Sequence, residues 1–220
     1  MGRWKVGLVA LALVAGCNGA SAASDGGSAP DAQTADAGGG GDAGSSLDAG
    51  LDGGTPTAGS AKVGGLVGGI GLRAKDALTE VDRLSSYDRM VTISETENAC
   101  ADLQAGIGHQ DREELRITLR NLTPSLDARP LTVGTYAVTM STTTPGLTAR
   151  VEFDGTDGVC SSGTLKEADG GTVTVTAAGV PPAGAWRGTF TAEFPDGSFT
   201  GQFDAPLCTG PAPNVTTCEP

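Results

Sequence analysis

Few side chains of this chain could do chemistry. His109 is the only histidine, and it lies in a loop-like stretch, Gly106-Ile107-Gly108-His109-Gln110-Asp111. No Ser-His-Asp or Cys-His arrangement can be built without it, and a lone loop histidine is most often solvated. The acidic candidates are Glu152 and Asp154, which a two-residue spacing places on one face of a strand, the face expected to be wet. Two carboxylates about 5 Å apart can hydrolyse a glycosidic bond with retention.

The segment Glu152-Phe153-Asp154-Gly155-Thr156-Asp157 resembles the Glu-x-Asp-x-x-Glu strand of some jelly-roll glycosidases. The resemblance implies that Glu152 is the nucleophile and Asp157 the acid/base. Asp157 is one methylene shorter than glutamate, and the neighbouring glycines indicate a turn. We therefore interpret these acids as solvent-facing residues of a hairpin. A carbohydrate-active hydrolase using Glu152 with Asp154 or Asp157 is the alternative function.

Two further patterns are weak. Gly69 to Ala74 matches the Gly-x-Gly-x-x-Ala dinucleotide pattern, but no apolar strand precedes it, so we interpret the match as chance. Asp154, Asp157 and Asp169 could contribute to a Ca²⁺ site, but their spacing misses the EF-hand loop. The sequence therefore predicts no catalytic residue, no cofactor and no metal site, and favours a protein that is not an enzyme.

The net charge of the chain limits which kinds of partner it can bind. The chain of 220 residues carries a formal net charge of −12. Such a chain repels phosphate backbones and anionic lipid headgroups, which argues against nucleic-acid binding and against membrane attachment by charge.

The N-terminal residues are expected to direct the chain to the cell envelope. Arg3 and Lys5 precede an apolar run that is too short to span a bilayer and fits a secretory signal. The following residues, Val14-Ala15-Gly16-Cys17, resemble the lipobox of bacterial lipoproteins. The resemblance implies that residues 1–16 are a cleaved signal peptide. It also implies that Cys17 becomes an acylated N-terminus, with palmitate among its three acyl chains.

Residues 17–60 are expected to connect this anchor to a folded domain. Of the 43 residues from 18 to 60, 34 are Gly, Ala, Ser or Asp, which cannot offset the entropy of ordering, so we predict a disordered tether. In enteric lipoproteins an Asp after the cysteine retains the protein in the inner membrane. The Asn18 of this chain therefore favours the outer membrane.

Residues 61–220 are predicted to be an all-β domain. Apolar and polar residues alternate over seven runs, 91–94, 115–120, 136–140, 149–154, 172–177, 185–194 and 199–205. Glycine-rich turns separate them, at Pro145-Gly146, at Asp169-Gly170-Gly171 (joining 159–166 to 172–178) and at Pro195-Asp196-Gly197. One-sided alternation favours an antiparallel β-sandwich of about eight strands with at most one or two short helices.

Two stretches could be helical. Asn98 as N-cap and Gly106 as stop predict a two-turn helix over 98–106. Residues 73–84 fit a helix and a strand equally well.

Four cysteines are left when Cys17 is lipidated, namely Cys100, Cys160, Cys208 and Cys218. An even number outside the cytoplasm suggests two disulfides. The short interval favours Cys208–Cys218, which leaves Cys100–Cys160.

The run from Gly188 to Cys208, with Gly134-Thr135-Tyr136 and Ala99-Cys100-Ala101, resembles uncharacterised lipoproteins of bacteria with GC-rich genomes. No activity is attached to that resemblance. Together these observations predict a membrane-tethered binding or structural module with no catalytic site, whose partner is an envelope protein or a glycan.

The anchor is directly testable. Replacing Cys17 with serine should remove the acyl chains and release the protein from the membrane fraction, because two or more chains are what anchors stably. Mass spectrometry of the N-terminal peptide measures the lipid. A free or disulfide-bonded Cys17 in the wild-type protein would contradict the prediction.

Overall fold

The computed structural model describes residues 56–81, 87–156, 158–161, 163, 165–179, 184–209 and 217–220. Several predictions fall outside these residues. They are the signal peptide, Cys17 and nearly all of the 17–60 tether, together with Asp157.

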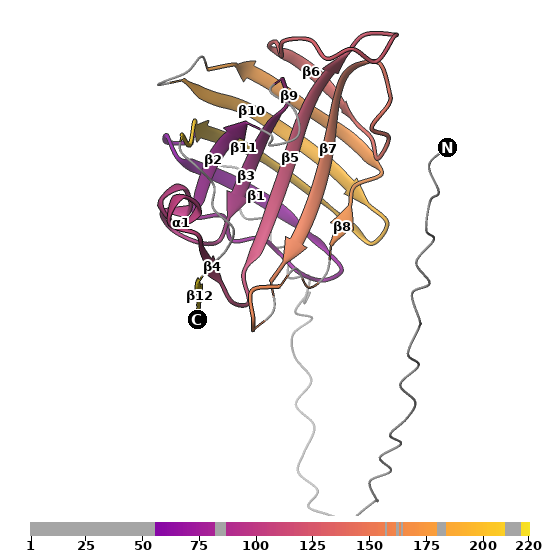
Figure 1. The fold of residues 1–220 in the computed structure, drawn as a ribbon. Helices are drawn as coiled ribbons and strands as arrows, with labels where there is room; N and C mark the ends of the chain where they lie inside the picture. Colours follow the sequence, from indigo (N-terminus) through magenta and orange to yellow (C-terminus); the bar gives the residue numbers. More distant parts are fainter. Residues whose placement is uncertain are drawn as a thin grey trace, which may run out of the picture. The chain divides into compact units, whose positions relative to one another are not determined.

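The described residues form twelve strands and one helix (Figure 1). In chain order these elements are β1 (Ser60–Val67), β2 (Asp76–Val81), β3 (Arg89–Ser94), α1 (Ala99–Ala105), β4 (Ile107–His109), β5 (Glu113–Leu122), β6 (Gly134–Val138), β7 (Gly146–Gly155), β8 (Lys166–Glu167), β9 (Gly170–Ala177), β10 (Ala185–Phe194), β11 (Gly197–Pro206) and β12 (Thr217–Glu219).

Ten of the strands form one continuous sheet. Its order is β1-β11-β10-β9-β6-β7-β5-β3-β2, with β8 paired to β7. All pairs in it are antiparallel except β6 with β7. The short strands β4 and β12 form a separate parallel pair. The all-β prediction is therefore confirmed.

The sheet curls until its two ends meet, which gives a nearly closed, barrel-like form (Figure 1). The Cys208 backbone N–H, just past β11, donates to the Thr79 carbonyl in β2 at 2.8 Å. The Thr79 hydroxyl donates to the Ala205 carbonyl at 3.0 Å. The described strands thus do not divide into the two sheets expected of a sandwich. Alternation specifies one buried and one wet face, and a single curled sheet satisfies it as well as two packed sheets do.

The inside of the curled sheet holds the core. Alternate residues of each strand point inward, as the pattern predicted, and the largest buried side chains include Tyr136, Phe199 and Phe203. Trp186 is also inside, at 4% exposure. The Phe199 ring packs edge-on against the Phe153 ring, with centroids 5.0 Å apart. The buried Tyr136 hydroxyl donates to the Thr132 carbonyl, which satisfies its polar end.

The two ambiguous stretches are resolved. Residues 76–81 are strand β2, so within 73–84 the described residues contain no helix. The predicted helix exists as α1, between Asn98 and Gly106, both in the left-handed conformation. Asn98 makes no side-chain cap. The Asp76 carboxylate in β2 accepts the Ala99 N–H at 2.7 Å instead.

One predicted hairpin is present and one is wrong. Pro195 and Asp196 join β10 to β11, as expected. Gly170 and Gly171 belong to strand β9 itself, and Lys166–Glu167 pairs with β7 rather than with β9. Glycine allows backbone conformations that suit a turn, but it also allows two strands to approach closely. Here Gly170 and Gly171 serve the close approach of β9 to its neighbour and form no turn.

Gly171 gives a test of that close approach. Its φ is +116°, and a Cβ there would lie 2.1 Å from the Thr191 carbonyl oxygen in β10. Gly171→Ala should therefore lower the free energy of unfolding by at least about 2 kcal/mol in urea denaturation.

Gly158→Ala is the matched control, because a Cβ at Gly158 meets nothing within 4 Å. It should change stability by no more than about 0.5 kcal/mol. Equal midpoints for the two variants would refute the steric argument.

Candidate functional site

Two disulfides tie together one end of the sheet. Cys100 in α1 is bonded to Cys208, and Cys160 is bonded to Cys218 in β12. All four predicted cysteines are thus paired, but the predicted partners are wrong. Closure of the sheet brings Cys208 beside β2 and α1, whereas β12 runs alongside β4 and carries Cys218 away from Cys208. Nearness in sequence was a poor guide because β12 joins a different sheet.

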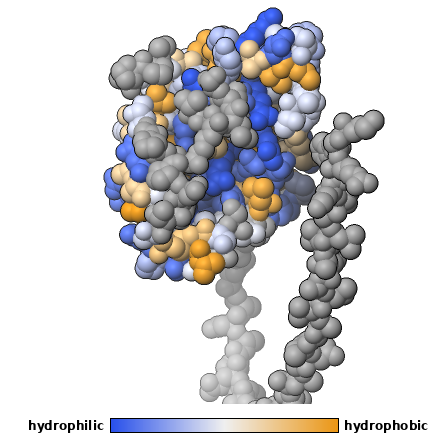
Figure 2. All heavy atoms as spheres, in the orientation of Figure 1, coloured by the Kyte–Doolittle hydropathy of each residue, from blue (hydrophilic) through white to orange (hydrophobic). Residues whose placement is uncertain are grey.

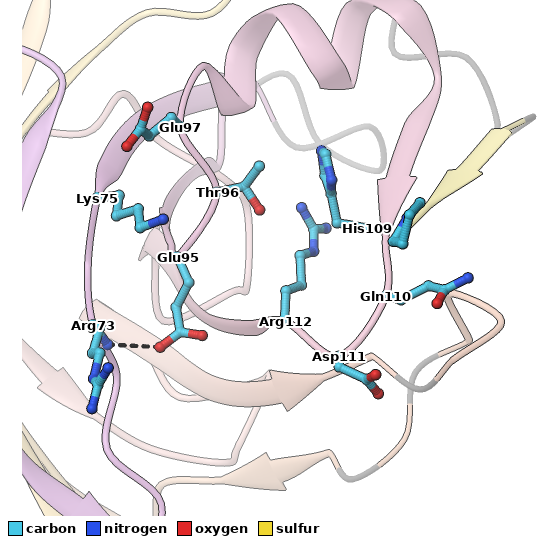
Figure 3. Close-up of a pocket in the computed structure, with 10 residues that line it drawn as sticks. Arg73, Lys75, Glu95, Thr96, Glu97, His109, Gln110, Asp111 and Arg112 are labelled. Carbon is cyan, nitrogen blue, oxygen red and sulfur yellow. Dashed lines mark hydrogen bonds between the residues drawn. The ribbon is translucent and has the colours of Figure 1, made fainter.

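A cleft of about 640 Å³ opens at this end (Figure 3). Three segments line most of it, namely the approach to β2, the turn after β3 and the link from β4 to β5. Lys75, Thr96 and Arg112 point into the cleft in Figure 3. The full lining is Arg73, Lys75, Glu95, Thr96, Glu97, His109, Gln110, Asp111, Arg112 and Pro220. Its volume lies in the range of small-ligand sites, and its walls carry charges of both signs.

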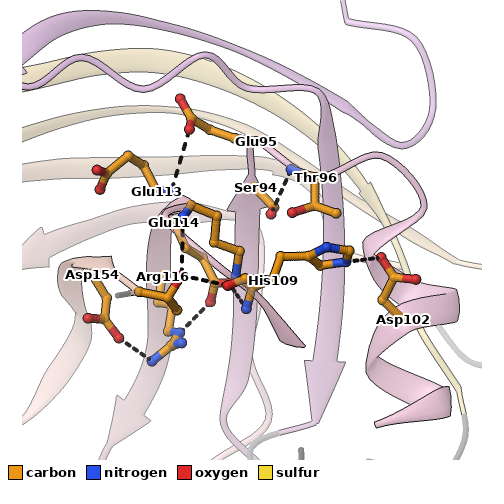
Figure 4. Close-up of polar contacts among 11 residues, drawn as sticks. Ser94, Glu95, Thr96, Asp102, His109, Glu113, Glu114, Arg116 and Asp154 are labelled. Atoms are coloured by element: carbon orange, nitrogen blue, oxygen red, sulfur yellow. Dashed lines mark hydrogen bonds and ion pairs between the residues drawn. The ribbon is translucent and has the colours of Figure 1, made fainter. Parts of the chain in front are cut away.

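Short-range contacts fix the cleft wall that contains His109. The His109 ring nitrogen Nε2 lies 2.8 Å from the Asp102 carboxylate in α1 (Figure 4). The Thr156 hydroxyl donates to the His109 carbonyl at 2.7 Å, and the Gln110 N–H donates to the Glu219 carbonyl at 2.8 Å. The expectation of a solvated loop histidine is therefore wrong. His109 is a partly buried residue of β4 that joins the helix to the small sheet.

Glu95, in the turn after β3, contacts Glu113, the first residue of β5, at the edge of the cleft. The Glu95 carboxylate accepts the Arg73 N–H at 2.8 Å (Figure 3) and the Glu113 N–H at 3.4 Å (Figure 4). Partial burial raises the pKa of the Glu113 carboxyl, and the negative charges of Glu95 and Asp154 raise it further. Sequence reasoning missed this pair, because each glutamate on its own matches no motif and only the register of β3 and β5 brings them together.

Of the acids singled out in the sequence, Glu152 and Asp154 lie on the outer face of β7 instead. Asp154 is 3% exposed, so the expected solvent exposure is wrong for this residue. It lies 3.4 Å from the Arg116 guanidinium, which also binds Glu114 at 2.5 Å (Figure 4). Glu152 lies 3.0 Å from Arg150, which also binds Glu167.

These residues belong to an array of ion pairs, which we call the arginine–carboxylate array. Figure 2 shows hydrophilic side chains gathered over β5 and β7. The array consists of Arg112, Arg116, Arg120, Arg150, Asp88, Glu114, Glu152, Asp154 and Glu167. Neither Glu152 nor Asp154 lines the cleft, and each is committed to an arginine, which suits a structural role better than a catalytic one.

The remaining patterns find no site among the described residues. Gly69 to Ala74 leads into strand β2, and no helix follows it. Asp169 is exposed. In the described part of the chain, no group of three or more His, Cys, Asp or Glu side chains could hold a metal ion. Nor has any helix there the length and apolar character needed to cross a membrane.

Comparisons of the chain with protein-family models, with curated proteins and with solved structures find no match. The interpretation of function therefore rests on the geometry described above.

The environment of Glu113 predicts a pH dependence of stability. Because its pKa is raised on folding, the folded state holds the proton more tightly than the unfolded chain does. Stability therefore falls as the pH rises above the ordinary glutamate pKa of 4.5. Glu113→Gln removes this pH-dependent contribution to the free energy of unfolding. Its gain in free energy of unfolding over wild type should be larger near pH 7 than near pH 4, measured by urea denaturation.

Glu193→Gln, at an exposed carboxylate of β10, provides the matched control for the substitution itself. The explanation fails if Glu113→Gln changes stability equally at both pH values.

Proposed function

We propose that this chain is a bacterial envelope lipoprotein whose disulfide-linked β domain is a binding module. Acylated Cys17 anchors it, in the outer membrane, and residues 17–60 tether the domain to that anchor. The lipobox supports the anchor, and the two disulfides suit an oxidising compartment.

The observation that carries the binding role is the cleft at the disulfide-linked end. The walls of the cleft come from segments far apart in sequence. The Cys100–Cys208 disulfide holds α1 beside these segments, and the pairing of β4 with β12 holds the link that follows His109. A site fixed in this way loses little conformational entropy when it binds a ligand. The charged side chains Lys75 and Glu97 have no partner among the described residues, so they are available to a ligand.

A cleft with free charges of both signs fits a polar partner that also carries both signs. A segment of another envelope protein has this character, because its side chains and backbone supply ammonium, carboxylate and amide groups. We therefore place the protein partner at the cleft.

Photo-cross-linking in intact cells tests this assignment. A photoreactive side chain at Gln110, in the cleft, should give one reproducible protein adduct, identified by mass spectrometry. The matched position is Thr143, exposed in the connection between β6 and β7 and outside the cleft. When Lys75→Glu is added to the protein that carries the photoreactive side chain at position 110, the yield of the adduct should fall, because one charge of the cleft is reversed. No adduct, or the same adducts from both positions, would contradict the proposal.

A hydrolase is the second candidate function, and Glu113 supports it better than Glu152 does, because Glu152 is paired with Arg150. General acid catalysis of hydrolysis uses a carboxyl whose pKa is raised. The raised pKa of Glu113 favours its protonated form. The Glu113→Gln variant separates the two functions, because a hydrolase would lose turnover whereas the cross-link at Gln110 would persist.

A further inference from the structure

The two disulfides lie in different surroundings, and Cys100–Cys208 is embedded in the closure of the sheet. Cys100 belongs to helix α1, and the Cys208 N–H donates to the Thr79 carbonyl at 2.8 Å. The Gln104 side chain of α1 contacts the bond, with its Nε2 atom 3.5 Å from the Cys100 sulfur and 3.9 Å from the Cys208 sulfur. The contacts around this bond therefore hold its two ends in place independently of the bond itself.

Cys160, in the second disulfide, has a strained backbone. Its φ is +56°, in the left-handed region that residues with a Cβ rarely adopt. Such a conformation costs free energy and persists only where the surrounding structure imposes it. The bond to Cys218 is a constraint of this kind. Because opening the bond would let Cys160 relax, the strain favours the reduced state of this disulfide.

Cys218, the partner of Cys160, belongs to a strand that is weakly attached to the domain. β12 has three residues, none of which is buried, and it pairs in parallel with β4 over those three residues. A pair this short contributes few hydrogen bonds and, here, no buried apolar side chain from β12. Both cysteines are only partly buried, and Val159, beside Cys160, is 72% exposed. A small thiol can therefore reach the bond, and β12 can leave β4 once the bond is open.

The attachment of β12 also affects the cleft. Pro220 directly follows β12 and lines the cleft, as does Gln110. The Gln110 N–H donates to the Glu219 carbonyl in β12 at 2.8 Å. Release of β12 would withdraw Pro220 from the cleft and leave the Gln110 N–H open to solvent or to a ligand. The state of one disulfide thus determines whether β12 covers this side of the cleft.

We infer that the Cys160–Cys218 disulfide is a thiol-exchange site, whose reduction by a dithiol releases β12 from the cleft. Strained or exposed disulfides are the ones that thiols reduce readily, whereas structural disulfides resist reduction. That a dithiol of the cell envelope meets this bond rests on the proposed function. Failure of the proposed function would appear as a Cys17 without lipid, and it would leave the difference between the two disulfides unchanged.

The exchange takes two steps. A thiolate of the dithiol attacks one sulfur of the bond, so that the S–S bond breaks and a mixed disulfide forms, while the other cysteine leaves as a thiolate and takes up a proton. The second thiol of the dithiol then loses its proton and attacks the mixed disulfide, which releases the remaining cysteine. The protein gains two electrons and two protons, and the dithiol is oxidised to an internal disulfide.

A redox titration of the full chain in dodecylphosphocholine micelles tests the selectivity. The protein is equilibrated with mixtures of reduced and oxidised dithiothreitol and trapped by alkylation, and mass spectrometry then measures each cysteine separately. Cys160 and Cys218 should be half reduced at a ratio of reduced to oxidised dithiothreitol about tenfold lower than the ratio that Cys100 and Cys208 require. Equal ratios, or earlier reduction of Cys100–Cys208, would overturn the inference.

Amide hydrogen exchange, followed by NMR at the ratio where Cys160–Cys218 alone is open, tests the release of β12. Exchange of the Gln110 N–H should accelerate at least about tenfold, because its acceptor leaves with β12. The Cys208 N–H, bonded to Thr79, is the internal control and should stay protected. The double variant Cys160→Ser with Cys218→Ser should give the same pattern without any reductant. A Gln110 N–H that stays protected in the reduced protein would overturn the inference.

Discussion

The rest of the structure depends on the few hydrogen bonds that join β2 to the end of β11. Thr79 is fully buried there, and both its carbonyl and its hydroxyl bond to residues 205–208. A twisted sheet of this size would otherwise expose two edges and an open inner face. By meeting here, the ends of the sheet enclose the aromatic core. They also set Cys208 beside α1, and so position one boundary of the cleft.

Because the core is enclosed by the sheet, the side chains on the outer face of the sheet can vary. The two halves of that outer face carry different kinds of side chain. Over β5 and β7, long side chains of opposite charge lie across the strands and bury Glu114 and Asp154 against arginines. Burial of that kind stabilises only when each charge is matched, so the array is tied to one register of the strands. Over β10 and β11 the same face carries one such ion pair, Arg187 with Asp204, beside a row of threonines.

Sequence patterns predicted many of the single strands of this fold correctly, but they did not predict which strands pair with each other. Alternation located Val91, Ile117, Val151 and Val173 inside, because a period of two is a local property. Pairings are not local. The parallel neighbours β6 and β7, the Cys160–Cys218 bond and the meeting of Glu95 with Glu113 all depend on which strand lies beside which. The dinucleotide-like glycines and the Glu152 segment show the converse, since a motif carries meaning only in its structural context.

The order of the disulfides has a consequence for proteolysis. Along the chain the bonded positions alternate, 100 with 208 and 160 with 218, so the two covalent loops overlap. A protease that cuts any one peptide bond between Cys100 and Cys218 therefore releases no fragment, because at least one disulfide still bridges the cut. Exposed loop tips, where nicking concentrates, can be cleaved once without loss of either piece. Only a cut on the N-terminal side of Cys100 can separate the disulfide-bonded part of the domain from the residues that precede it.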